Sequence, residues 1–135
     1  MSAIAIVTRL LSRDAAVKAI TSQIFPIEAP QQAPAPFIVV NIVSDLDEKL
    51  LQGAGRYQRT RISVEATAET GTQALALDAA AFAVLRDVIK QTISTAGGRF
   101  VDVDVSFANV AMTGSSLSRD LMVAMRQYFV RWRDG

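Results

Sequence analysis

The sequence predicts an α+β fold in two layers, a mostly antiparallel four-stranded sheet with a long hairpin, packed by N-terminal and central helices. Apolar residues recur at helical spacing over residues 4–11 and again over 73–92. Between and after these stretches the residues are β-branched and continuously apolar, or alternate between apolar and polar as in a strand with one covered face. This order of elements favours an antiparallel sheet with helices on one face. The elements are a helix, a proline-rich strap, a hairpin, a second helix and two strands. We expect residues 1–135 to form one domain.

The N-terminal third predicts a helix, a short helical turn and a proline-rich strap. Apolar residues at helical spacing give a helix over 4–11, and Ser12 is positioned to cap a second turn over 14–20. Residues 24–25 predict a brief extended piece that Pro26 ends. The prolines of 27–36 favour a stiff connection on the surface between helix and sheet.

The next region predicts a hairpin with an unusually long connection. Residues 37–45 are β-branched and almost continuously apolar, which is typical of a strand covered on both faces. Residues 60–68 alternate, with the even-numbered positions from Ile62 to Ala66 facing one way. The polar stretch between these strands is longer than closure of a hairpin needs. Long hairpin arms commonly reach a neighbouring molecule.

The second half predicts the strongest helix and two further strands. The helix spans 73–92, has a cap near Thr70 and carries an apolar stripe. Residues 100–107 alternate perfectly, and residues 119–133 form a last strand that is apolar on both sides. A strand of that kind is an aggregation hazard unless something covers it. The apolar stripe of the helix consists of Leu75, Phe82, Leu85 and Ile89. The inward-facing residues of the strand over 100–107 are Val101, Val103, Val105 and Phe107.

The composition excludes several classes of function. The chain has no cysteine and no histidine, so disulfides, thiolate nucleophiles and catalytic triads with an imidazole base are impossible. A net charge of +1 is too balanced for a dedicated nucleic-acid binder. The longest apolar runs are far shorter than the ~20 residues of a membrane-spanning helix, and the first residues do not resemble a signal peptide. We therefore predict no enzyme activity, no cofactor and no membrane partner.

Two acidic groups could nevertheless bind a metal ion. Asp102 and Asp104 share one face of a predicted strand, about 6.5–7 Å apart by strand geometry. A pair of carboxylates can act as acid and base or hold a divalent ion, but any half-solvated strand shows the same alternation. The stretch Asp45–Glu48 has a passing likeness to a calcium loop and lacks that loop's glycine and closing glutamate. We interpret both groups as solvated or interface residues.

Charged and aromatic residues on the hairpin and on the last strand are the candidate interface. Acidic residues lie on one arm of the hairpin and a basic patch with a tyrosine lies on the other, which favours pairing within the hairpin or between subunits. Cations interleaved with aromatics are also typical of a nucleic-acid groove, and cation–π stacking on Trp132 is the simplest alternative for the last strand. The candidate residues are Asp45, Asp47, Glu48, Arg56, Tyr57, Arg59, Arg61, Arg131 and Trp132.

An ordered set of short motifs resembles a known family. The segment LLSRDAAVKAITSQIFPIEAPQQAPAPFIVVNIVSD is similar to the start of the tail terminator, or tail completion, proteins of long-tailed phages and related particles. The strand RTRISVEATAET, the Ala- and Leu-rich helix after it and the closing RQYFVRWR also fit that family. The chain departs from the pattern at Ala66 or Thr67, where many members carry Cys or Trp. The matching motifs are Leu10–Ala16, Ile24–Pro26, Ala29–Gln31 and Pro36–Val39.

The resemblance implies a structural subunit of a hexameric ring. Such a ring caps the tail tube, stops its polymerisation and joins the tail to the head-side connector, with the tube protein and a connector (stopper) protein as partners. It lets DNA pass without specific binding, which a near-neutral charge suits. A ring would also cover the apolar last strand and would give the hairpin arm a neighbour to reach. We expect the protein in the host cytoplasm before assembly and at the tail–neck junction of the virion afterwards. The alternatives are another neck, connector or tube ring subunit, or a small divalent-ion-dependent domain.

Overall fold

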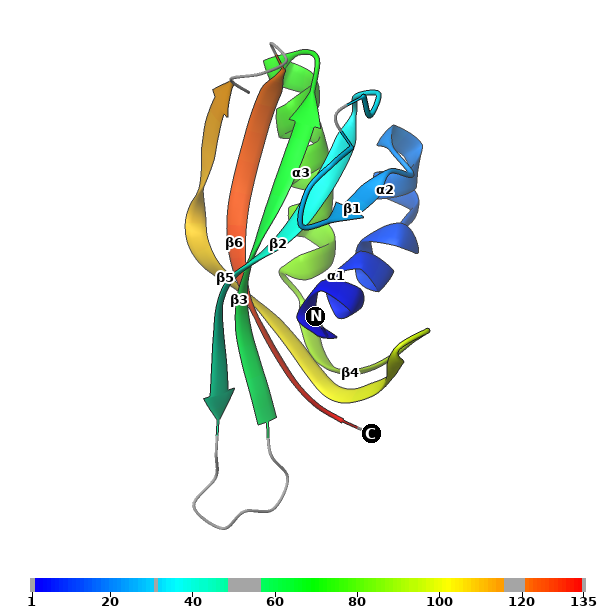
Figure 1. Ribbon diagram of the computed structural model, residues 1–135, viewed down its shortest axis with the longest axis vertical. Coiled ribbons are helices and arrows are strands. Elements are labelled where there is room, and N and C mark those ends of the chain that lie inside the picture. Colours follow the sequence, from blue (N-terminus) through cyan, green and yellow to red (C-terminus); the bar gives the residue numbers. More distant parts are fainter. Residues whose placement is uncertain (1, 31, 49–56, 116–120, 135) are drawn as a thin grey trace.

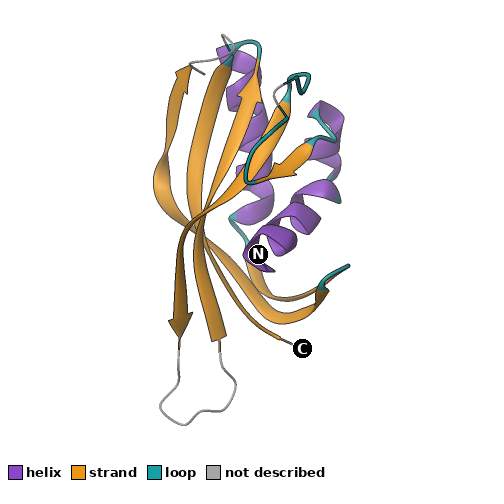
Figure 2. Cartoon of the chain, viewed as in Figure 1, coloured by secondary structure: helices purple, strands orange, loops and turns teal. Residues whose placement is uncertain are grey.

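The computed structural model describes residues 2–30, 32–48, 57–115 and 121–134, with side chains described outside 45–48 and 109–115. Three helices cover one face of a strongly curled sheet (Figures 1 and 2). The helices are α1 (Ser2–Ser12), α2 (Ala15–Ile20) and α3 (Gly71–Leu85). The strands are β1 (Ile24–Pro26), β2 (Phe37–Glu48), β3 (Tyr57–Ala68), β4 (Val88–Thr95), β5 (Gly98–Ser115) and β6 (Met122–Asp134).

The two-layer α+β architecture is confirmed, but the sheet is larger than predicted. It has six strands in the order β1-β2-β3-β6-β5-β4, and β1 pairs with β2 in parallel while the other neighbours are antiparallel. The sheet is mostly antiparallel, as predicted, but the predicted number of four strands was wrong. One of the added strands is β1, the brief extended piece before the strap, which lies beside Ile38–Val40.

The other added strand, β4, replaces the end of the predicted central helix. Helix α3 begins after Thr70, whose hydroxyl accepts a hydrogen bond from the amide of Gln73, and it ends at Leu85 instead of Thr92. Residues 88–95 are rich in β-branched side chains, which favour a strand. Ile89, assigned above to the helix stripe, is 71% exposed, while Ile93 is buried. Leu75 of the predicted stripe is also exposed, because the buried stripe runs instead through Ala74, Leu77, Asp78, Ala81 and Leu85.

The N-terminal elements follow the prediction closely. Helix α1 is amphipathic and buries one face, including Ile6, Val7 and Leu11. The cap of α2 is Asp14, whose carboxylate accepts from the amide of Val17 at 3.1 Å, and not Ser12, whose hydroxyl donates to the Arg9 carbonyl. Among the helices that the structure describes, none has the length and apolar character needed to cross a membrane.

The main core lies between the helices and one face of the sheet. It contains Ile38 and Val40 of β2, Ile62 and Val64 of β3, and side chains from all three helices and the later strands. The strap packs on the opposite face, where Ala33 joins a smaller apolar cluster with Phe37, Val39 and Leu121. Its path is fixed by Thr21 and Gln23, which donate to the carbonyls of Pro36 and Pro34. The predicted surface strap between helix and sheet is therefore confirmed.

The last strand lies inside the sheet. Strand β6 is hydrogen-bonded to β3 on one side and to β5 on the other. Its even-numbered residues Tyr128, Val130 and Trp132 are buried, and Phe129 on the alternate face is half-buried. The chain itself therefore covers both edges of this strand. Neighbouring subunits of a ring are therefore not needed to cover the edges of this strand.

Bulges break the perfect alternation predicted for β5. Val103 and Val105 are buried as expected, but Val101 is only half-buried and Phe107 is 41% exposed. The register shifts between Val101 and Asp104, and again after Phe107. Each extra residue of a bulge moves the following side chains to the other face, so a strict period of two does not hold along this strand.

Candidate interface at the base of the hairpin arm

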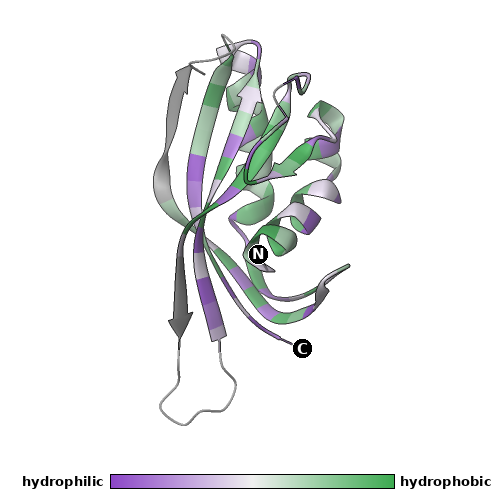
Figure 3. Cartoon of the chain, viewed as in Figure 1, coloured by the Kyte–Doolittle hydropathy of each residue, from purple (hydrophilic) through white to green (hydrophobic). Residues whose placement is uncertain are grey.

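The hairpin of β2 and β3 continues beyond the region that the helices cover. After the pair Ile42 and Ile62, five further residue pairs extend the ladder as far as Glu48 opposite Tyr57. This part, which we call the arm, descends away from the helices in Figure 1. The side of the arm formed by β3 is hydrophilic (Figure 3). Polar contacts of the described side chains join the base of the arm to β5 and β6.

A carboxylate on β5 holds the base of the arm. Asp102 Oδ2 accepts hydrogen bonds from Tyr57 Oη at 3.0 Å and from Arg133 Nε at 2.8 Å. These three side chains come from β5, β3 and β6, so one carboxylate connects three strands. The bonds from Arg133 and Tyr57, in that order, hold the pKa of Asp102 below its usual value. Asp102 is thus a charged anchor for the first residue of β3.

The backbone at Asp102 explains how its side chain reaches the arm. Its φ is +51°, the left-handed region, and the register of β5 against β6 shifts between Val101 and Asp104. Aspartate is one of the few residues with a side chain that tolerate this conformation. A bulge redirects the side chain from the regular alternation of the strand. The local sequence therefore places a carboxylate where a regular strand would not.

Arginine side chains stack on aromatic rings above this anchor. The guanidinium carbon of Arg131 lies 4.0 Å from the centre of the Tyr57 ring, and that of Arg59 lies 4.1 Å from the centre of the Phe129 ring. Arg61 lies 5.5 Å from the same Phe129 ring and donates from Nε to Gln127 Oε1 at 2.7 Å. Stacking of this kind holds arginine side chains in a fixed orientation. We call Tyr57, Arg59, Arg61, Asp102, Phe129, Arg131 and Arg133 the arm-base cluster.

The structure brings together four of the nine predicted interface residues, namely Tyr57, Arg59, Arg61 and Arg131. Trp132 is buried, so its ring is not available at the surface of the single chain. Arg56 lies outside the described residues. The backbones of Asp45, Asp47 and Glu48 belong to β2 and lie opposite Thr60, Gln58 and Tyr57, whereas Arg59 and Arg61 lie opposite Leu46 and Ser44. The side chains of those three acidic residues are outside the described set.

The two carboxylates considered for a metal ion have separate partners. Asp102 binds Tyr57 and Arg133, whereas Asp104 Oδ1 accepts from the backbone amide of Lys90 at 2.8 Å. Within the described ranges no group of three or more acidic side chains could hold a metal ion. The arrangement therefore gives these aspartates structural roles in joining strands.

A buried ion pair between α3 and β6 was not predicted from the sequence. Asp78 of α3 accepts from Arg126 Nε of β6 at 2.8 Å, and the Arg126 guanidinium lies 4.1 Å from the centre of the Phe82 ring. The hydroxyl of Tyr128 is buried nearby without a hydrogen-bond partner among the described residues. Burial and the charge of Asp78 raise the pKa of this tyrosine. The available signal was the position of Asp78, the single charge of α3, on the buried stripe of that helix.

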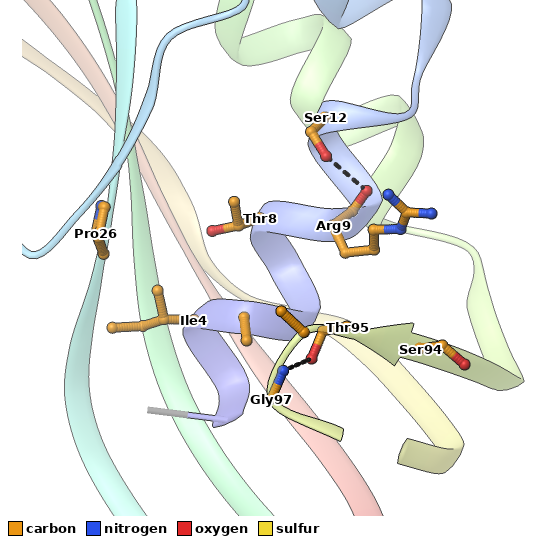
Figure 4. A pocket seen from close by; sticks show the side chains of 10 residues that line it. Ile4, Thr8, Arg9, Ser12, Pro26, Ser94, Thr95 and Gly97 are labelled. Atoms are coloured by element: carbon orange, nitrogen blue, oxygen red, sulfur yellow. Dashed lines mark hydrogen bonds between the residues drawn. The ribbon is translucent and has the colours of Figure 1, made fainter. Parts of the chain in front are cut away.

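A mainly apolar depression lies between α1, Pro26 and the turn that joins β4 to β5 (Figure 4). Two of its polar side chains are engaged locally, since Ser12 donates to the Arg9 carbonyl and Thr95 accepts from the amide of Gly97. The buried hydroxyl of Thr8 has no hydrogen-bond partner among the described residues. Arg9 is the one charged residue of its lining. The depression has no pair of groups that could act as acid and base.

Comparison with known proteins agrees with a structural role. The model of a family described as tail completion protein gp17 matches residues 5–129. Among solved structures, a chain from the virion of a native gene transfer agent particle has a TM-score of 0.69 and 21% sequence identity, covering 98% of this chain and 94% of that chain. At this identity the likeness shows a shared fold. No curated protein matches the sequence.

Proposed function

The chain belongs to the tail completion protein gp17 family of phage structural proteins, and we propose that it is a ring subunit at the end of the tail. In this proposal six copies form a ring that caps the tail tube, stops its polymerisation and joins it to the head-side connector. The observation that carries the proposal is the family match, which extends over nearly the whole chain. The protein would accumulate in the host cytoplasm and then act at the tail–neck junction.

The anchored arm supports this role. A hairpin that leaves the body of the subunit and is fixed at its base can reach a neighbouring copy, the tube protein or the connector. The arm-base cluster contains the half-buried arginines Arg59, Arg61 and Arg131, and arginine is favoured in protein interfaces. We propose that partner contacts use Arg59, Arg61 and Arg131 together with the arm residues Asp45, Asp47, Glu48, Arg56 and Tyr57. Trp132 would support this surface from the core.

The balance of charge supports passage of DNA through the ring. A net charge of +1 gives little general attraction for phosphates, and binding to phosphates is what would retard a passing duplex. Many of the arginines in the described part of the chain are already paired or stacked, as Arg126 is with Asp78 and Arg133 with Asp102. DNA would therefore pass without specific contacts.

Removal of the gene from a particle-producing strain tests the proposal. Without a terminator, tubes should grow to irregular lengths and should not be joined to heads, because no ring stops the tube or binds the connector. Electron microscopy of the lysate measures both effects. Loss of a tube subunit would instead remove tails altogether, which would favour the alternative of a tube protein. Tails of normal length attached to heads would contradict the proposal.

A further inference from the structure

A row four strands wide crosses the sheet from edge to edge where neither β1 nor β4 extends it. This row, which we call the waist, runs from Ile42 to Ile62, Tyr128 and Phe107 on strands β2, β3, β6 and β5. Strand β1 pairs with β2 only as far as Val40, and β4 pairs with β5 only as far as Val105. In the described part of the chain, therefore, no strand covers either end of the waist.

Each end of the waist exposes large apolar side chains. Val43 is 48% exposed at the β2 end. Ile27, whose amide donates to the carbonyl of Val40 on the same strand, is 50% exposed. Phe107 is 41% exposed at the β5 end. These are three of the five large apolar side chains that are exposed among the described residues. Single exposed apolar residues are normal, but their concentration at two uncovered edges indicates contact surfaces.

The β5 end is a rigid apolar projection. The Phe107 ring packs edge-on against Phe82 and Tyr128, with ring centres 5.4 and 6.2 Å apart. Arg126, held by Asp78, lies 5.5 Å from the centre of the Phe107 ring. The phenylalanine is therefore fixed in place before any partner binds, which lowers the entropic cost of a contact.

Both ends of the waist are bulged, so they meet a partner through side chains. The register shifts between Ile42 and Ser44 at one end and between Phe107 and Asn109 at the other. A bulge interrupts the row of backbone donors and acceptors that a continuous added strand would need. Ile27 adds to this interruption, because its φ of +70° is rare for a β-branched residue and ends the pairing of β1.

We propose that the β2 end of the waist on one copy binds the β5 end on the next copy. This inference rests on the proposed ring and identifies its subunit contact. The two surfaces differ and lie on opposite edges of one sheet, so a head-to-tail contact buries both of them, whereas a twofold dimer would bury one and leave the other exposed.

Cysteine trapping tests this contact, because the natural chain has no cysteine. The double variant Val43→Cys with Phe107→Cys is oxidised in concentrated solution, or treated with a short bismaleimide, and analysed on a denaturing gel. A head-to-tail contact gives a ladder of dimers, trimers and higher species. Each single variant gives little dimer, because two identical ends do not meet. A matched control combines Val43→Cys with Ala96→Cys, which is also exposed and lies in the β4–β5 turn, at the end of β4 away from the waist.

The outcomes are distinct. A ladder several-fold stronger in the double variant than in the control supports the contact. Dimers of equal strength in either single variant indicate a twofold contact, and a double variant no stronger than the control shows that the edges do not meet; either result overturns the inference. If Phe107→Cys does not fold, the isosteric Ser106→Cys at the neighbouring exposed position replaces it. Trapping needs no particles, so a failed gene-removal experiment would refute the proposed function without deciding this result.

Discussion

Replacing Arg126 by methionine should destabilise the protein much more than replacing its partner Asp78 by asparagine. The two side chains form an ion pair of 2.8 Å, but their exposure differs: 21% for Arg126 and 3% for Asp78. If Arg126 is removed, the remaining carboxylate is buried without its cation and cannot reach water. If the charge of Asp78 is removed, the remaining guanidinium is partly hydrated and still stacks on Phe82.

The magnitudes follow from this asymmetry. Leaving one charge of a buried pair without compensation costs about 3–5 kcal/mol, so we expect a loss in this range for Arg126→Met. Asparagine at position 78 keeps the volume and can still accept the hydrogen bond from Arg126, so Asp78→Asn should cost about 1–2 kcal/mol. The double variant Asp78→Leu with Arg126→Met removes both charges and should recover most of the loss.

Urea unfolding followed by tryptophan fluorescence measures these differences. Trp132 is the single tryptophan and is buried in the core, so its emission reports loss of tertiary structure. The slope of the free energy against urea should remain unchanged, because the variants alter stability and not the surface exposed on unfolding. Equal losses for the two single variants would refute the reasoning, and so would a double variant as unstable as Arg126→Met alone.

Three further changes test the strand assignment, the open sheet face and the arm anchor. Ile93→Ala should lower the free energy of unfolding by about 2–5 kcal/mol because Ile93 is buried in β4. Ile89 is exposed, so Ile89→Ala should change the free energy of unfolding by less than about 0.5 kcal/mol in the same urea titration. Equal losses for the two variants would contradict the assignment of residues 88–95 to a strand. Burial raises the pKa of Glu65, so the folded state holds its proton more tightly and loses stability as the pH rises above the usual glutamate value of about 4.3. Glu65→Gln should therefore raise the melting temperature at pH 7 and not at pH 3.5. A gain of the same size at both pH values would count against this explanation. Tyr57→Phe and Asp102→Asn should each speed hydrogen exchange at the start of β3, and the double variant should add little more because both changes remove the contact between these two side chains. In the wild type this contact should weaken as the pH falls through the lowered pKa of Asp102. Unchanged exchange in the variants would show that the contact does not hold the arm.

The fold class and most elements could be predicted because they depend on local patterns. Helix α1 has a regular apolar face, Thr70 caps α3, and the alternation over Ile62–Ala66 gives the buried face of β3. These signals lie within a few residues of the positions that they determine. The family resemblance likewise depended on an ordered set of local motifs, and the family is confirmed by the match over residues 5–129.

The end of the central helix could not be located from periodicity. Ile89 continues the spacing of Phe82 and Leu85, so a helical interpretation of residues 86–92 satisfies the pattern. Residues 88–95 form a strand because they pair with β5, and that pairing depends on residues 98–105, which lie outside the segment whose periodicity was considered. Tertiary contacts override a short periodic signal in this way.

The candidate site was predicted in its residue types and not in its contacts. Tyr57, Arg59, Arg61 and Arg131 do lie together, but the carboxylate that organises them is Asp102, which the sequence pattern placed with Asp104. A bulge separates these two aspartates into different environments, and no single-sequence pattern locates a bulge between alternating valines.

The structural evidence for a binding partner lies at the edges of the waist and not at the terminal strand β6. Because β3 and β5 enclose β6 within one chain, an apolar last strand is no argument for assembly. Val43 and Phe107 are a better argument, since they remain exposed after every strand of the described sheet has been paired. Both lie where a flanking strand, β1 or β4, stops short of the waist. The short flanking strands thus leave uncovered the two edges on which the proposed ring contact depends.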